Sequence, residues 1–182
     1  MNEQSILDLI KGDPWMMNII TTASSLNLRD WMIGAGFVRN KVWNYLADIE
    51  RQAVDTSDVD LIYFDPDGND QISDEKLSIE MRNKTGIDWE IVNEFYTHTR
   101  DGLSPYVSTE DALSRWPETV TAIAVTLDAG EQLRLVAPYG IHDLVNFIVR
   151  KSPKFDGGND RILERVSKKK WQEKWPMITL DI

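Results

Sequence analysis

The chain has 182 residues and a net charge of −10 at pH 7, which argues against nucleic acid as a partner but allows a nucleotide, because a few basic side chains can neutralise a triphosphate. It has no cysteine and two histidines, which excludes disulfides, thiol catalysis and zinc–thiolate centres and leaves too few ligands for a histidine-rich metal site. No apolar run is long enough to span a membrane and the N-terminus has no basic leader, so we expect a cytoplasmic protein.

The first predicted elements are two helices, Ser5–Lys11 and a second from Trp15 to about Leu26. The pair Asp13–Pro14 predicts the start of the second helix, because aspartate is a good N-cap and proline suits the first helical position. We group residues 1–28 as an N-terminal helical segment. Residues 29–182 are expected to form the remaining domain, in one compact unit with it.

A turn of small residues, Gly34–Gly36, follows a short apolar strand at Trp31–Ile33. The next helix is predicted from about Val38 to Ile49 by its apolar spacing. A glycine turn at the start of a helix offers backbone N–H groups to a phosphate. Arg39 lies one turn into this helix, where it could contact that phosphate or form a surface ion pair. Asn40 could hydrogen-bond a ligand or the backbone.

Two acids open the next predicted strand, Asp58–Phe64. Asp58 and Asp60 are one residue apart, so their side chains share a face of the strand. Two carboxylates this close repel each other unless a cation lies between them, and hard oxygen ligands suit Mg²⁺. The alternative is a strand start with solvated acids. Because the rest of the strand is apolar, where charge is costly, we favour a metal site for phosphoryl or nucleotidyl transfer.

A calcium loop is an alternative interpretation of the segment Asp65–Lys76. Five positions fit an EF-hand, but aspartate stands where glycine belongs and lysine stands where the bidentate glutamate belongs. We therefore expect an acidic turn that leads into a helix from Asp74 to about Thr85, capped by Ser73 or Asp74.

The second half of the chain adds strands and helices in a mixed order. The predicted elements are a strand at Asp88–Asn93, a helix start at Thr109–Leu113, a hairpin of Val120–Leu127 and Gln132–Val136 joined at Asp128–Gly130, an apolar run at Ile141–Val149 and a final helix at Asp160–Trp171. The basic run Lys168–Lys170 is typical of a solvated helix face. Trp171 and Trp175 are expected to anchor the C-terminal helix by packing. The fold class is α/β (α+β), a mixed β-sheet flanked by helices.

Four sequence blocks together resemble a known family. They are Gly36–Trp43, Asp58–Asp65, Trp116–Ala122 and Ala137–Leu144, within a likeness that runs from about Asp30 to Pro176. On these blocks the chain resembles a bacterial nucleotidyltransferase-like family of the DNA polymerase beta nucleotidyltransferase superfamily. The resemblance implies a Gly turn that holds the triphosphate of an NTP, and an Asp-x-Asp strand with a third acid on a neighbouring strand that holds Mg²⁺ (or Mn²⁺).

The chain departs from this pattern at two places. The small pair of the turn is Gly34–Ala35 or Gly36–Phe37, without the serine that the superfamily often has. The segment Glu94–His98 stands where the family tends to have Gln-Ala-Arg-Met-His, so an arginine is missing. For the third acid, Glu90 and Asp88 share a strand face, and Glu90 fits the hydrophobic–acid–hydrophobic pattern better.

We therefore expect a Mg²⁺-dependent nucleotidyltransferase that moves a nucleoside monophosphate from an NTP to an unknown acceptor. In this hypothesis Asp58, Asp60 and Glu90 bind the metal, and Glu90 helps to activate the acceptor hydroxyl. Gly34–Gly36, with Arg39 and Asn40 behind it, binds the nucleotide. The acceptor is a small molecule, a protein or an RNA end, with the acidic charge placing RNA last. The alternative is a catalytically inactive module that senses nucleotide or binds a protein.

Overall fold

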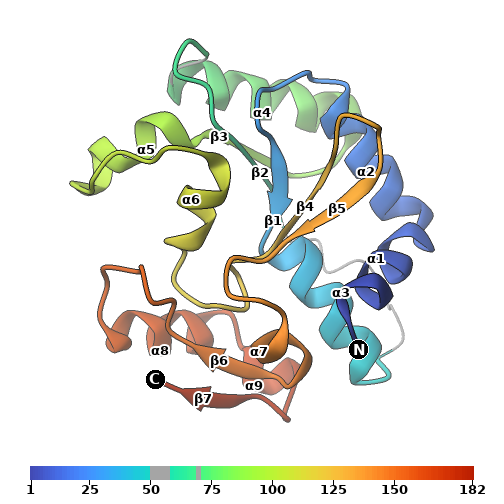
Figure 1. Ribbon diagram of the computed structural model, residues 1–182, viewed down its shortest axis with the longest axis vertical. Coiled ribbons are helices and arrows are strands. Elements are labelled where there is room, and N and C mark those ends of the chain that lie inside the picture. Colours follow the sequence, from blue (N-terminus) through green and yellow to red (C-terminus); the bar gives the residue numbers. More distant parts are fainter. Residues whose placement is uncertain (50–57, 69–70) are drawn as a thin grey trace.

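A mixed five-stranded sheet lies at the centre of the computed structural model, which describes residues 1–49, 58–68 and 71–182 (Figure 1). Its strands are β1 (Met32–Gly34), β2 (Val59–Tyr63), β3 (Trp89–Asn93), β4 (Ala124–Leu127) and β5 (Leu133–Val136). They lie in the order β3-β2-β1-β4-β5. Strands β2 and β3 are parallel, and the other neighbours are antiparallel. The expected mixed sheet flanked by helices is confirmed.

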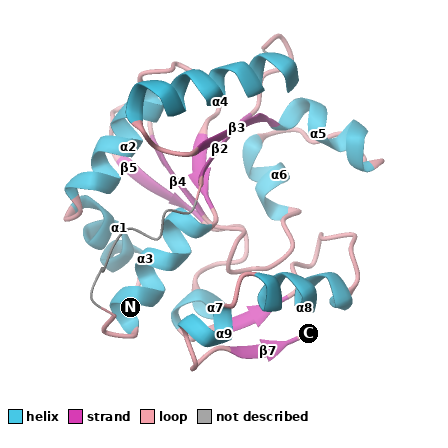
Figure 2. Ribbon diagram, turned by 180° about the vertical axis from the view of Figure 1, so that it is seen from behind, coloured by secondary structure: helices cyan, strands magenta, loops and turns pink. Residues whose placement is uncertain are grey.

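Helices surround this sheet, and a smaller C-terminal group of elements lies at one end of it (Figure 2). The helices are α1 (Glu3–Lys11), α2 (Pro14–Ser24), α3 (Gly36–Leu46), α4 (Gln71–Thr85), α5 (Glu94–Asp101), α6 (Thr109–Ser114), α7 (His142–Val145), α8 (Asn159–Lys168) and α9 (Trp171–Lys174). A parallel pair of short strands, β6 (Ile148–Arg150) and β7 (Thr179–Asp181), accompanies α7–α9. No helix in the described part of the chain is both long and apolar enough to cross a membrane.

The N-terminal helices pack on the same core as the sheet. The Asp13 carboxylate accepts hydrogen bonds from the N–H groups of Trp15 and Met16, and Pro14 is the first residue of α2, as predicted. Asp13 also forms an ion pair of 2.8 Å with Lys41 in α3. Ile6 of α1 is fully buried in the hydrophobic cluster that includes the sheet residues, so this segment is part of the main core.

Several boundaries differ from the sequence predictions. Helix α3 begins at Gly36 and ends at Leu46, before Asp48, whose left-handed backbone conformation (φ of 51°) does not continue a helix. Helix α4 begins at Gln71, so Ser73 and Asp74 lie inside it and are not its caps. Residues 69–70 of the calcium-loop alternative lie outside the described residues.

The C-terminal region contains more elements than predicted. The expected helix Asp160–Trp171 is interrupted at Lys170, which has φ of 53° and separates α8 from α9. The indole rings of Trp171 and Trp175 are buried beside Trp43, with ring centroids 5.8 and 4.9 Å from that of Trp43. Both tryptophans are therefore the packing anchors that the sequence predicted, and they fix the C-terminal elements to α3.

Candidate functional site

Three carboxylates from two parallel strands converge at one end of the sheet. Asp58 precedes β2, Asp60 lies in β2, and Glu90 is the register partner of Asp60 on β3. Each offers an oxygen atom within 4.8 Å of the oxygens of the other two. Asp88 instead forms an ion pair with Arg82 of α4. The structure thus brings Glu90, and not Asp88, to the pair of aspartates.

Burial and the neighbouring charges change the pKa of Asp60. Burial raises the pKa of Asp60 from 3.8 to about 7, with further increases from the charges of Asp58 and Glu90, while Lys169 and Arg39 act in the opposite direction. Three hard oxygen donors that repel one another form a set that a divalent cation such as Mg²⁺ fits, because the cation would neutralise the repulsion. The residues present therefore suit the metal that the sequence pattern implies.

This cluster predicts a pH-dependent stability of the metal-free protein. A carboxyl whose pKa is raised on folding stabilises the folded state below its unfolded pKa, and that contribution is lost as the pH rises to about 7. We expect the melting temperature of the chelator-treated wild type to decrease as the pH rises from 5 to 8. The melting temperature of chelator-treated Asp60→Asn should decrease less over the same range. Differential scanning calorimetry of both proteins would measure this, and parallel pH curves would contradict it.

The turn between β1 and α3 places backbone N–H groups beside the acids. Ala35 occupies the turn with φ of 51° and ψ of −120°, a conformation that favours glycine, and its N–H group donates to the carbonyl of Ile123 at 3.0 Å. A Cβ atom on Gly34 would lie 3.0 Å from the ring of Trp116, so a larger residue there would require the ring to shift. Helix α3 begins at Gly36, and its N-cap residue Ala35 makes no side-chain capping hydrogen bond. Its first N–H groups can therefore bind an anion.

A cleft of about 610 Å³ connects the acids, this turn and the C-terminal elements. Its basic lining residues are Arg39, Arg115, Arg161, Arg165 and Lys169. Arg161, Arg165 and Lys169 are spaced four residues apart, at positions that share one face of the α8 segment. Lys168, Lys169 and Lys170 are exposed, as expected of a solvated face, and Lys169 also lines the cleft.

A buried acid, Glu118, holds Arg165 in place in the lining of the cleft. The Arg165 Nε donates to Oε1 of Glu118 at 2.7 Å, and the Glu118 side chain is fully buried. The Glu118 Oε2 atom also accepts a hydrogen bond from the hydroxyl of Thr121 at 2.8 Å. This pair attaches α8 to the segment before β4, which fixes the distance across the cleft.

Arg39 is buried and packs against two aromatic rings. Its guanidinium lies 4.2 Å from the ring centroid of Trp171 and 5.3 Å from that of Trp43, and it donates to Oδ1 of Asn40 at 2.8 and 3.2 Å. Only 5% of the surface of Arg39 is exposed, so the alternative that placed it on the protein surface is wrong. Gly36 and Arg39 line the cleft. Gly34 and Asn40 are absent from the described lining.

The sequence predictions missed the basic wall of the cleft, which Arg115, Arg161, Arg165 and Lys169 form. Arg115, Arg161 and Arg165 were not expected at the site, and neither was α5, which supplies Thr97 to the cleft. The spacing of Arg161, Arg165 and Lys169 was a signal of a basic helix face, but the direction of that face depends on how α8 packs.

Two comparisons identify the family. A family model described as nucleotidyltransferase matches residues 21–180. A solved structure described as a CCA-adding enzyme head domain is 36% identical, with a TM-score of 0.86, and the match covers 99% of this chain and 96% of that chain. The chain therefore belongs to this nucleotidyltransferase family, as the sequence blocks indicated.

More distant structures share the fold. A CCA-adding enzyme in complex with ATP is 16% identical, with a TM-score of 0.55, over 96% of this chain and 41% of that chain. A tRNA-processing enzyme with CTP is 18% identical, with a TM-score of 0.53, over 90% of this chain and 43% of that chain. This chain thus spans less than half the length of either one. The comparison with curated proteins gave no match.

Proposed function

We propose that this member of the nucleotidyltransferase family transfers a nucleoside monophosphate from an NTP to an acceptor hydroxyl. One observation carries the proposal: the three carboxylates Asp58, Asp60 and Glu90 converge on a cleft that basic side chains also line. A basic wall suits a triphosphate, and a carboxylate cluster suits its metal ion. The related structures that are described with ATP and CTP support a nucleotide as the ligand.

The metal would be held by Asp58, Asp60 and Glu90. Their oxygen donors suit Mg²⁺ or Mn²⁺. When bound, such a metal supplies charge stabilisation to the entering oxygen and to the leaving pyrophosphate.

The residues of the chain position the reactants. The free N–H groups at the start of α3 and the side chains of Arg161 and Lys169 would bind the phosphates from two sides of the cleft. The acceptor oxygen forms a bond to the α-phosphorus, the bond from that phosphorus to pyrophosphate breaks, and the hydroxyl proton passes to the Glu90 carboxylate. Arg39, which packs against the indole rings of Trp43 and Trp171, would keep its positive charge near the acids.

A nucleotide-sensing or protein-interaction module is the second candidate. It is favoured by Ala35, which lies in a backbone conformation suited to glycine and has no hydroxyl for a phosphate. The sensor predicts NTP binding without turnover, and the protein-interaction module predicts no NTP binding at all. The presence of a third carboxylate in the cluster favours the enzyme, because an inactive relative does not need to keep all three.

Calorimetric titration with each of the four NTPs, with and without Mg²⁺, tests the proposal. We expect at least one NTP to bind in a metal-dependent manner. Failure of all four to bind would overturn both the enzyme and the nucleotide-sensing module.

The basic wall makes a separate prediction for binding. Replacing either Arg161 or Lys169 by glutamine should weaken the binding of that NTP by roughly tenfold, the usual effect of one charge-assisted hydrogen bond. Calorimetry of each variant would measure this change. Lys168→Gln is the matched control, because Lys168 is exposed on α8 and is absent from the described cleft lining. Equal affinities for all three variants would show that α8 does not contact the phosphates.

A further inference from the structure

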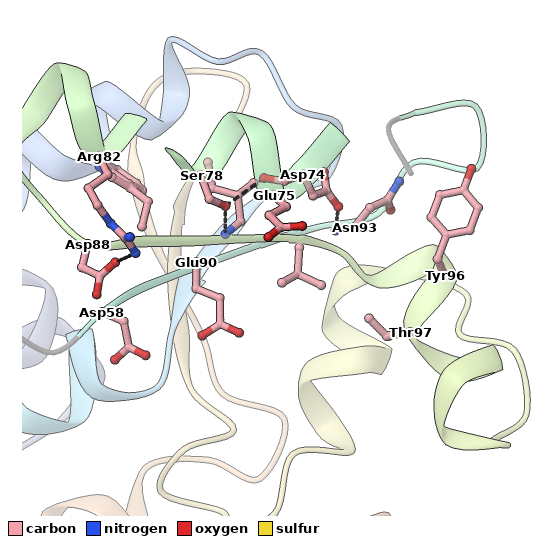
Figure 3. A pocket seen from close by; sticks show the side chains of 13 residues that line it. Asp58, Asp74, Glu75, Ser78, Arg82, Asp88, Glu90, Asn93, Tyr96 and Thr97 are labelled. Carbon is pink, nitrogen blue, oxygen red and sulfur yellow. Dashed lines mark hydrogen bonds and ion pairs between the residues drawn. The ribbon is translucent and has the colours of Figure 1, made fainter. Parts of the chain in front are cut away.

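A second cavity reaches the carboxylates along the edge of the sheet. It is a groove of about 460 Å³ that α4, β3 and α5 line (Figure 3). Asp58 and Glu90 line both this groove and the cleft, so the two cavities meet at the acids. An acceptor in the groove and a nucleotide in the cleft would therefore face each other across Glu90.

The groove and the cleft have opposite charge. Asp74 and Glu75 of α4 line the groove in addition to the carboxylate cluster. Among the described lining residues of the groove, Arg82 is the single basic side chain, and it is already paired with Asp88. The five basic side chains of the cleft are absent from this lining. A phosphate group in the groove would thus find acids and no available cation.

This charge pattern disfavours an RNA end as an acceptor that reaches Glu90 through the groove. Proteins bind nucleic acid chiefly by neutralising its phosphates with lysine and arginine. The groove has the reverse composition, so a strand of nucleotides that led to Glu90 along it would be repelled. A neutral or positively charged compound would not be repelled.

The edge strand is also closed to an extended peptide. A peptide that adds to a sheet needs the outward N–H groups of the edge strand. On β3, the N–H group of Ile91 donates to Ser78 Oγ at 3.0 Å, and that of Asn93 donates to Asp74 Oδ2 at 2.7 Å. Side chains of α4 therefore occupy these positions, and β-strand addition is blocked there.

The remaining features of the groove suit a small polar compound. Tyr96 of α5 stands at one end, and 37% of its surface is exposed. An aromatic face of this kind packs against a sugar ring or an organic cation. Glu75 of α4 lies between Tyr96 and the Arg82–Asp88 pair, where it can pair with an ammonium group.

We propose that the acceptor is a small hydroxyl compound, neutral or positively charged, that enters through this groove and presents its hydroxyl at Glu90. The inference rests on the proposed nucleotidyl transfer and names the class of its second substrate.

Three sugars of similar size and different charge test this class: glucosamine, glucose and glucose 6-phosphate. Each would be titrated into the ¹⁵N-labelled protein with Mg²⁺ and a non-hydrolysable analogue of the NTP that binds. We expect glucosamine to shift amides of α4, β3 and α5 and to bind about fivefold more tightly than glucose, with glucose 6-phosphate weakest. Glu75→Gln should reduce the preference for glucosamine. Glu80→Gln, also on α4 but outside the described groove lining, should keep it.

The second arm uses an RNA hairpin with a single-stranded 3′ end and an NTP labelled at the α-phosphate. Transfer of label to the RNA would overturn the inference and leave the proposed function standing. Glucosamine binding that is absent, or no tighter than that of glucose 6-phosphate, would also overturn it. Absence of NTP binding would instead overturn the proposed function itself.

Discussion

Asp60→Asn is expected to reduce nucleotidyl transfer by roughly a thousandfold or more while the fold stays intact. Asp60 is the central acid, since it lies two residues from Asp58 and opposite Glu90 in the β2–β3 register. Asparagine keeps the shape of the side chain but removes the charge that would hold the metal. The measurement is pyrophosphate release from the NTP that binds, in the presence of the three sugars and the RNA hairpin.

The control for this variant is Asp67→Asn. Asp67 is an exposed acid in the turn after β2, outside the described lining of the cleft and of the groove. It should keep full activity and full metal-dependent NTP binding, whereas Asp60→Asn should lose both. Amide spectra of the two variants should match that of the wild type away from the site. A fully active Asp60→Asn protein would refute the site.

Local sequence rules were sufficient to predict that Asp58 and Asp60, at the start of β2, lie close together. The alternation of side chains along a strand by itself places Asp58 and Asp60 on one face. Glu90 needed one more step, because its position depends on β3 pairing with β2 in parallel, with Glu90 opposite Asp60. The hydrophobic residues on either side of Glu90 were enough to prefer it over Asp88.

The basic wall could not be predicted in the same way. The position of α8 across the cleft is fixed by contacts between residues that are far apart in sequence, such as Arg165 with Glu118 and Trp171 with Trp43. The break at Lys170 carries neither glycine nor proline as a signal. The groove depends likewise on side chains of α4 that reach the edge of β3.

Arg165→Ala should cause the largest loss of stability among these substitutions. The Glu118 carboxylate is fully buried, and Arg165 is the basic residue that neutralises it, through hydrogen bonds of 2.7 and 3.4 Å. Removing one partner of a buried ion pair leaves an uncompensated charge, which costs about 3 kcal/mol of unfolding free energy. At this chain length that loss corresponds to a fall of roughly 6–12 °C in melting temperature.

A double variant that also removes the charge of Glu118 is the decisive comparison for Arg165→Ala. In the double variant Glu118→Gln, Arg165→Ala the buried charge is gone, so much of the lost stability should return, although the hydrogen bonds to α8 do not. Lys168→Ala on the same helix should change the melting temperature little, because Lys168 is exposed. If the double variant recovers stability but still binds NTP weakly, the ion pair positions the basic wall as well as stabilising the fold. If Arg165→Ala and Lys168→Ala have the same melting temperature, the Arg165–Glu118 pair does not hold α8 against the segment before β4.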